Sequence, residues 1–318
     1  MYELADASDD HHNHHDGHAR HHHHHDHDSN DTDGASLVHA NAAHFDAEAN
    51  ATDDSPMRLE VARRLARALR AAYAFDEDAT TVMDYACGTG LVSRALAPHA
   101  RVLVGVDVSQ GAVDRYNLRV ANQGIPPAEM RAVCAELRGD AQELAALGGE
   151  RFDVVISGSH VGSMILPPAR RSVLFCFVLG RVVSRRGKCT MAYHHFADIA
   201  ETTRVLAFFL KPGGSLLVAD IMKRTKPAPG GLSSGSGSGA GAGEEPDEVI
   251  PKRYHHIVAH TAGLGEADMR GAFEGAGLEA FAFRTAARAR TWGSGKEVDF
   301  FVASGVKPLE DAGQALST

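Results

Sequence analysis

Acidic side chains and glycines recur in the first half of the chain at points where predicted strands end. Asp84 precedes a turn that contains Gly88 and Gly90, and this turn leads from a predicted strand into a helix. The two glycines permit backbone conformations and a close ligand approach that a Cβ would block. Asp107 ends the next strand, where a carboxylate can accept hydrogen bonds from both ribose hydroxyls of an adenosine. Glu136 ends the third strand, where it is placed to meet an adenine edge.

Short strands and helices alternate around these residues, and they must bring the strand ends together. Continuously apolar strands between helices are typical of a parallel sheet covered on both faces. The ligand crevice of such a sheet lies at the carboxyl ends of its strands, so the loops after Tyr85, Asp107, Glu136 and Ser157 are expected to converge. After a first strand within 80–90, strands are predicted at 101–109, 130–137, 151–157 and 215–221, with helices at 55–73, 91–100, 109–124, 140–149 and 198–214.

The remaining segments set the predicted domain limits. A helix at about 266–276 and two antiparallel strands at 278–286 and 296–305 close the fold, and the Gly/Ser-rich stretch 225–248 is predicted to be a flexible loop. The sequence therefore predicts a single domain over residues 44–308, between a disordered tail over 1–43 and a short C-terminal tail over 309–318.

Histidines dominate the N-terminal tail. Eleven of the 20 histidines lie between His11 and His27, and this segment has too little apolar surface to offset the entropy of ordering. Clustered imidazoles bind zinc, nickel or copper ions, which makes the tail a candidate chelating segment; the alternative is a repeat without a binding role. No metal site is predicted in the core. The longest run in the tail is His21, His22, His23, His24 and His25.

Composition narrows the class of protein. The net charge of −9 is skewed by the acidic tail, and the remainder shows no basic footprint for nucleic acid. The four cysteines are far apart and form no CxxC pair, which indicates reduced intracellular thiols. There is no apolar signal segment and no run of about 18 apolar residues, so we expect a cytoplasmic protein without a membrane span.

An ordered set of motifs resembles the class I S-adenosylmethionine-dependent methyltransferases, and most closely the small-molecule methyltransferases of fungi. The motifs are "VMDYACGTG", "VLVGVDVS", "FDVVIS", "MAYHHF" and "LKPGGSLLVAD", and the likeness covers about residues 44–308 apart from two gaps. The resemblance implies a Rossmann-like, doubly wound α/β sheet of seven strands in the order 3-2-1-4-5-7-6, with strand 7 antiparallel. It also implies S-adenosylmethionine as the cofactor.

The same resemblance implies roles for single residues. Asp84 and the turn that follows it would hold the methionine part of the cofactor, and Asp107 would accept the ribose hydroxyls. Ala86 stands where many members have a first glycine, and Glu136 stands where aspartate is common. The implied cofactor-binding set is Asp84, Ala86, Cys87, Gly88, Gly90, Asp107, Val108, Glu136 and Leu137.

The implied reaction is transfer of a methyl group to an oxygen, nitrogen or carbon atom of a small molecule. The sulfonium is a good leaving group, so the protein mainly aligns the reactants, which can contribute about 7–11 kcal/mol. A base is needed only if the nucleophile must lose a proton. His194 and His195 are the candidates because imidazole titrates near neutrality. The alternative is that one of them packs in the core and the other bonds on the cofactor side.

Two other functions compete with this one. A nicotinamide-dependent oxidoreductase on a related fold requires G-x-G-x-x-G, but Ser93 stands where the third glycine is needed, which disfavours that interpretation. The second competitor is not an enzyme: an inactive methyltransferase-like chain or a His-rich metal-binding protein.

The stretch 157–189 separates the fourth predicted strand from "MAYHHF" and is foreign in composition, with five arginines and no acidic residue. It is a candidate substrate lid or a partner-binding or membrane-surface element. The third hypothesis, which we favour, is a translated intron, because a structureless loop of this length inside a domain is unusual.

Overall fold

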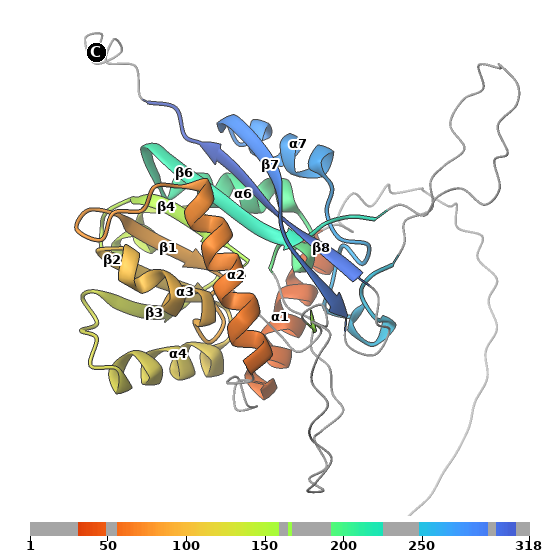
Figure 1. The fold of residues 1–318 in the computed structure, drawn as a ribbon, viewed down its shortest axis with the longest axis horizontal. Helices are drawn as coiled ribbons and strands as arrows, with labels where there is room; N and C mark the ends of the chain where they lie inside the picture. The colour runs from red at the N-terminus through yellow and green to blue at the C-terminus, as the bar shows by residue number, and fades with distance from the viewer. Residues whose placement is uncertain are drawn as a thin grey trace, which may run out of the picture.

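The computed structural model describes residues 31–48, 56–158, 165–166, 192–224, 248–291 and 297–309. These residues form one mixed β-sheet with helices on both of its faces (Figure 1). The predicted α/β class is confirmed.

The sheet runs in the order β3-β2-β1-β4-β6-β8-β7-β5. The first five of these strands are parallel, and β8 lies antiparallel between β6 and β7. The predicted order 3-2-1-4-5-7-6 with an antiparallel seventh strand is thus confirmed, and the two-residue β5 adds a short edge beside β7. The strands are β1 (Thr81–Tyr85), β2 (Val102–Asp107), β3 (Met130–Cys134), β4 (Phe152–Ser157), β5 (Ile165–Leu166), β6 (Leu210–Ile221), β7 (Glu279–Thr291) and β8 (Glu297–Val306).

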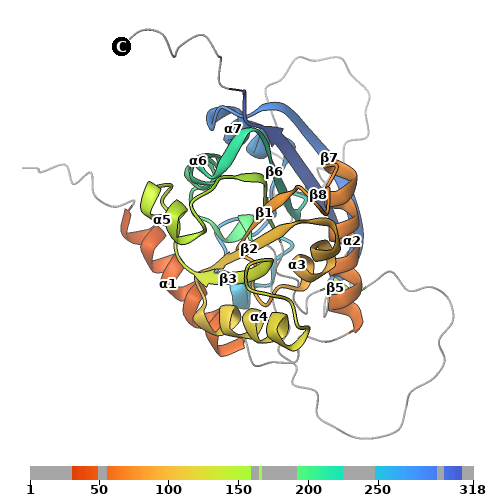
Figure 2. The same cartoon turned by 90° about the vertical axis from the view of Figure 1, so that its left-hand side faces the viewer.

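Helices cover the two faces because successive strand residues point to opposite sides. Val82 faces a core shared with α2 (Pro56–Ala72), α3 (Leu91–Leu96) and α4 (Gln110–Asn122). The next residue, Met83, faces the opposite core, which is shared with α6 (Ile199–Phe208) and α7 (Glu266–Gly275). Figures 1 and 2 show these two helical layers. The opposite layer consists of α5 (Ala141–Ala146), α6 (Ile199–Phe208) and α7 (Glu266–Gly275).

Helix α1 (Asp31–Glu48) is the main departure from the predicted organisation. It begins inside the segment 1–43 that the sequence assigned to a disordered tail, and it lies beside α4 (Figure 2). Its residues DGASLVHANAA form no apolar stripe, so periodicity does not reveal it. The helix is instead placed by contacts with distant segments, which are described below.

The other boundaries differ by a few residues. Helix α6 ends at Phe208, before the predicted limit of 214, and β6 already begins at Leu210. The proline in "LKPGG" cannot continue a helix, and Gly213 takes a positive φ of 77° that a turn requires. Strand β3 ends at Cys134, so Glu136 lies in the loop just beyond it.

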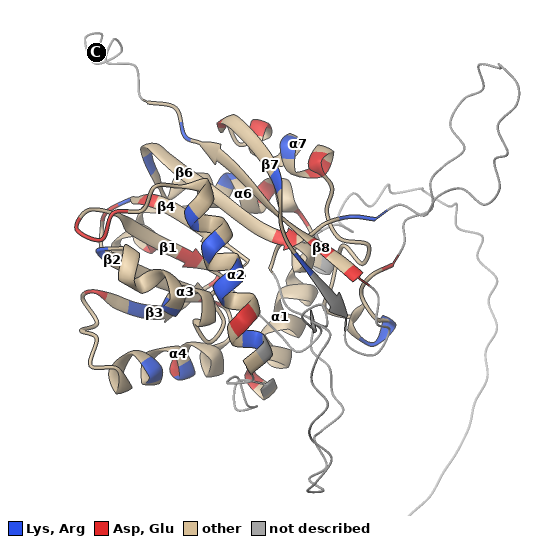
Figure 3. Ribbon diagram, viewed as in Figure 1, with Lys and Arg blue, Asp and Glu red and all other residues tan. Residues whose placement is uncertain are grey.

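Charge is distributed unevenly over the helices. Helix α2 carries arginines along its outer surface, among them Arg63, Arg67 and Arg70 (Figure 3). No helix within the described ranges combines the length and apolar character needed to cross a bilayer. The histidine run at 21–25, most of the stretch 157–189 and most of the Gly/Ser stretch 225–248 lie outside the described residues.

Candidate functional site

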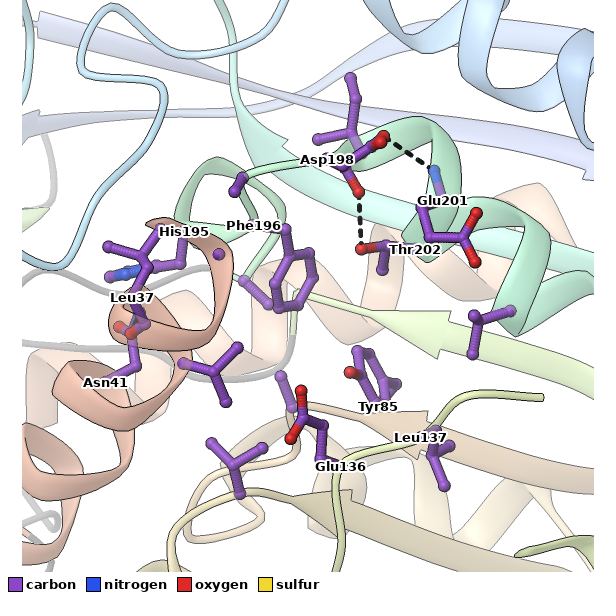
Figure 4. Close-up of a pocket in the computed structure, with 18 of the residues that line it drawn as sticks. Leu37, Asn41, Tyr85, Glu136, Leu137, His195, Phe196, Asp198, Glu201 and Thr202 are labelled. Atoms are coloured by element: carbon purple, nitrogen blue, oxygen red, sulfur yellow. Dashed lines mark hydrogen bonds between the residues drawn. The ribbon is translucent and has the colours of Figure 1, made fainter. Parts of the chain in front are cut away.

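A pocket of about 950 Å³ lies at the carboxyl ends of β1, β2 and β3 (Figure 4). Its volume is within the range of small-molecule and cofactor sites. Helix α1 approaches from one side with Leu37 and Asn41, and the start of α6 approaches from another with Asp198 and Thr202. The pocket wall includes these residues predicted from the sequence: Ala86, Gly88, Asp107, Val108, Glu136, Leu137 and His195.

The turn after β1 is built from left-handed backbone conformations. Ala86, Gly88 and Gly90 have φ values of 57°, 53° and 80°. A Cβ on Gly90 would lie 2.5 Å from the ring of Tyr116, so the turn packs directly against α4. The turn is further held by Cys87, whose backbone N–H donates to the Val106 carbonyl over 3.1 Å. This packing fixes the turn at the pocket wall.

Asp107 joins the ends of β1 and β2. Its Oδ2 accepts a hydrogen bond from the Gly88 N–H at 2.7 Å, and its Oδ1 accepts one from the Ser109 N–H at 3.0 Å. Burial raises the pKa of Asp107, and the backbone N–H bonds partly oppose that effect. Because a carboxylate has about four acceptor sites, Asp107 retains capacity for hydroxyl groups of a ligand in the pocket.

Three of the predicted cofactor residues lie behind the pocket wall: Asp84, Cys87 and Gly90. Asp84 is fully buried and accepts a hydrogen bond from the hydroxyl of Ser93. Ser93, which replaces the third glycine of a dinucleotide motif, therefore holds Asp84 at the base of the turn. Burial raises the pKa of Cys87 well above its ordinary value, so this thiol stays protonated and is unsuited to nucleophilic chemistry.

The two adjacent histidines have different surroundings. His194 is fully buried, and its Nδ1 lies 2.7 Å from Oδ1 of Asp220. His195 lines the pocket, and its Nδ1 lies 2.5 Å from the carbonyl oxygen of Ile257. A carbonyl can only accept, so Nδ1 of His195 carries the proton, and the lone pair of the neutral ring is on Nε2. His195 alone of the pair combines contact with the pocket and a defined acceptor atom.

Several pocket residues were not predicted from the sequence. Leu37, Val38, Asn41 and Phe45 come from α1, and the Phe45 ring packs edge-on against His195 at a centroid distance of 5.7 Å. Of these four residues, only Phe45 lies inside the predicted domain limits of 44–308. Tyr85, Phe196 and Asp198 also line the pocket. Burial raises the pKa of the Tyr85 phenol, which keeps it a neutral donor.

The histidines after the Gly/Ser stretch have structural partners. Nε2 of His255 lies 3.0 Å from the Ile250 carbonyl, and Nε2 of His260 lies 3.1 Å from the Phe196 carbonyl. Desolvation lowers the pKa of His260. Within the part of the chain that the structure describes, no three histidine, cysteine or acidic side chains are grouped to hold a metal ion.

Comparison with known proteins identifies the class. The family profile described as "Methyltransferase domain" matches residues 82–176, which include the turn after β1, Asp107 at the end of β2 and Glu136 just beyond β3. An uncharacterized methyltransferase of Schizosaccharomyces pombe is 27% identical over 290 residues, which cover 81% of this chain and 85% of that protein. Residues 82–176 carry a methyltransferase domain, a class whose cofactor is S-adenosylmethionine.

Solved structures similar to this chain include two methyltransferases. The N-methyltransferase NodS from Bradyrhizobium japonicum, in complex with S-adenosylhomocysteine, has 14% sequence identity and a TM-score of 0.48, over 84% of this chain and 98% of that one. Magnesium protoporphyrin IX methyltransferase from Synechocystis, with bound S-adenosylmethionine, has 13% identity and a TM-score of 0.45, over 86% and 97%.

Proposed function

We propose that the methyltransferase transfers the methyl group of S-adenosylmethionine to a small apolar acceptor within the pocket at the carboxyl edge of the sheet. The observation that carries this proposal is the convergence of Ala86, Gly88, Asp107 and Glu136 with His195 on one cavity. Four separate loops supply these residues, and the first three loops follow the strand ends that the sequence assigned to an adenosine ligand.

The cofactor half of the pocket is assigned to the ends of β1, β2 and β3. The turn from Ala86 to Gly90 would hold the methionine part, with Asp84 and Cys87 supporting it from behind. Asp107 would accept the ribose hydroxyls, and Val108, Glu136 and Leu137 would border the adenine. The fit is supported by the left-handed turn, which permits close approach, and by the acceptor capacity of Asp107.

The acceptor half is assigned to α1 and the start of α6. This half of the cavity is lined by apolar side chains, which favour an apolar or aromatic acceptor: Leu37, Val38, Phe45, Phe196 and Ile199. The charged side chains near this half already have partners: Asp198 accepts from the Glu201 N–H at 2.9 Å, and Glu201 pairs with Arg204.

The residues provide orientation and a proton acceptor. When bound, the cofactor supplies a methyl group on a sulfonium, which a nucleophile can take up by in-line displacement. The pocket wall holds the acceptor, and alignment of this kind can contribute about 7–11 kcal/mol. Nε2 of His195 is the candidate base for a hydroxyl or ammonium acceptor, a role that typically contributes about 10²–10⁴-fold in rate.

Calorimetry with S-adenosylhomocysteine tests the cofactor site. The natural chain is expected to bind at micromolar ligand. Asp107→Asn is expected to lose most of this affinity, because an asparagine side chain has only one acceptor oxygen. Asp114→Asn is the matched control, because Asp114 is an exposed acid on α4 that accepts a hydrogen bond from the side chain of Gln110. No heat and no thermal shift at millimolar ligand would refute the proposal, and a shift with NADH instead would favour the oxidoreductase.

Labelled cofactor and a panel of phenols, carboxylates and amines test the acceptor. Transfer to apolar phenols or amines is expected, and transfer to charged carboxylates alone would contradict the assigned acceptor half.

Transcript sequencing and the intact mass test the hypothesis that 157–189 is a translated intron. That hypothesis, the domain limits 44–308 and the cytoplasmic location stay predictions.

A further inference from the structure

We propose that Asp220 is a positioning residue for His195 and acts through His194. The inference rests on the proposed function, because it assigns the device that orients the candidate base. Asp220 lies near the end of β6, is fully buried and is not part of the pocket wall. It therefore acts on the pocket only through the residues it binds.

Both carboxylate oxygens of Asp220 are engaged by the backbone or ring of its neighbours. Oδ1 lies 2.7 Å from Nδ1 of His194 and 2.5 Å from the N–H of Ile221. Oδ2 accepts a hydrogen bond from the backbone N–H of His194 at 3.0 Å. The carboxylate thus makes hydrogen bonds to both the ring and the backbone N–H of His194. These two bonds fix the rotamer of the ring and the path of the chain.

The carbonyl of His194 connects this residue by hydrogen bonds to the distant segment 257–260. It accepts hydrogen bonds from the N–H groups of Ala259 and His260 at 3.0 and 2.9 Å. The His260 ring returns to the same loop, where its Nε2 donates to the Phe196 carbonyl over 3.1 Å. Hydrogen bonds therefore join segment 194–196 to segment 257–260, and Asp220 binds His194, the residue that makes two of these bonds.

His195 is oriented by both of these segments, through its backbone and through its ring. Its backbone follows directly from His194, and its ring donates from Nδ1 to Ile257, two residues before Ala259. The rings of His194 and His195 also pack against each other, with centroids 4.4 Å apart and planes inclined by 36°. A shift of His194 would move the backbone of His195 and the carbonyl that selects its tautomer.

The consequence for the proposed reaction is a defined atom at the pocket. With the proton fixed on Nδ1, Nε2 is the ring nitrogen that carries the acceptor lone pair. Loss of the carboxylate at Asp220 removes the charged partner of the His194 ring, so the carbonyl of Ile257 and the ring of His195 lose their fixed relation. The other tautomer, with the proton on Nε2, would then be populated, and that ring cannot accept a proton from the pocket.

The test is the tautomer of His195, read by long-range ¹H–¹⁵N correlation of the imidazole nitrogens. In the natural chain we expect a single tautomer with the proton on Nδ1. In Asp220→Asn we expect a mixture of the two tautomers, and in Asp220→Glu a partial return to one. Asp153→Asn is the matched control, because Asp153 is another carboxylate that joins two strands, at their opposite ends, and it is expected to leave the His195 signals unchanged.

Kinetics provide the second measurement, with an acceptor found in the labelled-cofactor panel. Asp220→Asn is expected to lower kcat roughly 10²-fold, as a misplaced catalytic group does, while KM for the cofactor changes less than about threefold. A proportional change in both, or no change in either, would count against positioning. Thermal melting and S-adenosylhomocysteine binding check that the variant is folded.

Several outcomes would overturn the proposal. A mixture of His195 tautomers in the natural chain would overturn it, and this can be read even if Asp220→Asn fails to fold. A single, unchanged tautomer in the folded Asp220→Asn variant would also overturn it. Failure of the proposed function is distinguishable. If S-adenosylhomocysteine does not bind, the cofactor assignment is wrong, but the tautomers are still read. If His195→Gln keeps full kcat, His195 is not the base, whatever Asp220 does to its ring.

Discussion

Asp46 on α1 and Ser109 at the start of α4 are joined by a hydrogen bond of 2.6 Å from the Ser109 hydroxyl to Oδ1 of Asp46. The same oxygen accepts from the N–H of Gly111 at 2.9 Å. A carboxylate is favoured at a helix N-terminus, both by the free N–H groups and by the helix dipole. This bond places α1 beside the pocket, where Leu37 and Phe45 form part of its wall.

The first prediction concerns this anchor. Asp46→Ala removes the acceptor of two hydrogen bonds. The free energy of unfolding is expected to fall by about 1–2 kcal/mol, because the bonds involve a charged group. If α1 must be seated for the cofactor to bind, the Kd for S-adenosylhomocysteine rises roughly tenfold, since about 1.4 kcal/mol is a factor of ten. Asp46→Asn keeps one acceptor oxygen and should lie between. Calorimetry measures both, and equal Kd values for all three chains would refute the role of the anchor.

The second prediction concerns the conformation of Ala86. A φ of 57° costs a residue with a Cβ about 1–2 kcal/mol. Ala86→Gly removes that cost but adds about 0.4–1 kcal/mol of unfolded-chain entropy. The free energy of unfolding is therefore expected to stay equal or to rise by up to about 1.6 kcal/mol, whereas Ala86→Val lowers it because β-branched residues disfavour positive φ. Urea unfolding checks both variants, and destabilisation by Ala86→Gly of more than about 1 kcal/mol would contradict the argument.

The third prediction separates crowding from backbone strain at two glycines with similar φ. Gly90 has a φ of 80° and faces the Tyr116 ring, while Gly124 has a φ of 70° and no atom within 4 Å of a built Cβ. Gly124→Ala is expected to cost up to about 1.6 kcal/mol, because strain of about 1–2 kcal/mol is partly offset by about 0.4–1 kcal/mol of lost unfolded-chain entropy. Gly90→Ala has the same two contributions and adds about 1–3 kcal/mol of overpacking against Tyr116. Equal losses of unfolding free energy in the two variants would show that Tyr116 yields without cost.

The fourth prediction is a pH dependence at Asp153. This carboxylate accepts from Lys211 at 2.9 Å and from the N–H and hydroxyl of Thr81 at 2.8 and 2.7 Å. Partial burial raises its pKa, but the bonds from Lys211 and Thr81 outweigh that effect and hold the pKa below the ordinary value. A lowered folded pKa contributes stability above the unfolded pKa, about 3.9 for aspartate, and loses it as the pH falls through the lowered value.

The measurement is the urea midpoint of the natural chain and of Asp153→Asn as a function of pH. The natural chain is expected to be the more stable one near neutrality. The difference should shrink below about pH 4, where the unfolded aspartate is protonated, and vanish once the folded one is protonated too. A difference that is independent of pH would mean that the carboxylate acts by shape and not by charge.

The sheet was predictable because its strands are continuous apolar runs that end in small or acidic residues. Val82, Val154 and Leu217 face one core and their neighbours face the other, which is the alternation that a sheet covered on both faces requires. The two-residue strand β5 and the early start of β6 at Leu210 were not predicted, since both depend on a pairing partner far along the chain.

The pocket was predictable only in part. Asp107 and Glu136 were found because they follow strands, whereas α1 has no apolar stripe and is held by Asp46, a residue with no local signal of that role. The histidine pair illustrates the same limit. Adjacent residues of the same type cannot be ranked by sequence, and only their partners, Asp220 for His194 and Ile257 for His195, distinguish them.

By itself the sequence determined the acidic residues at the strand ends, because these follow from local patterns of apolar, glycine and acidic residues. The strand order and the kind of cofactor came from the resemblance of its ordered motifs to a known family. Only the tertiary structure decided which residues reach the pocket, that α1 forms one of its walls, and which imidazole presents an acceptor atom. These depend on contacts between segments such as 46 and 109 or 195 and 257, whose separation along the chain leaves no periodic or local trace.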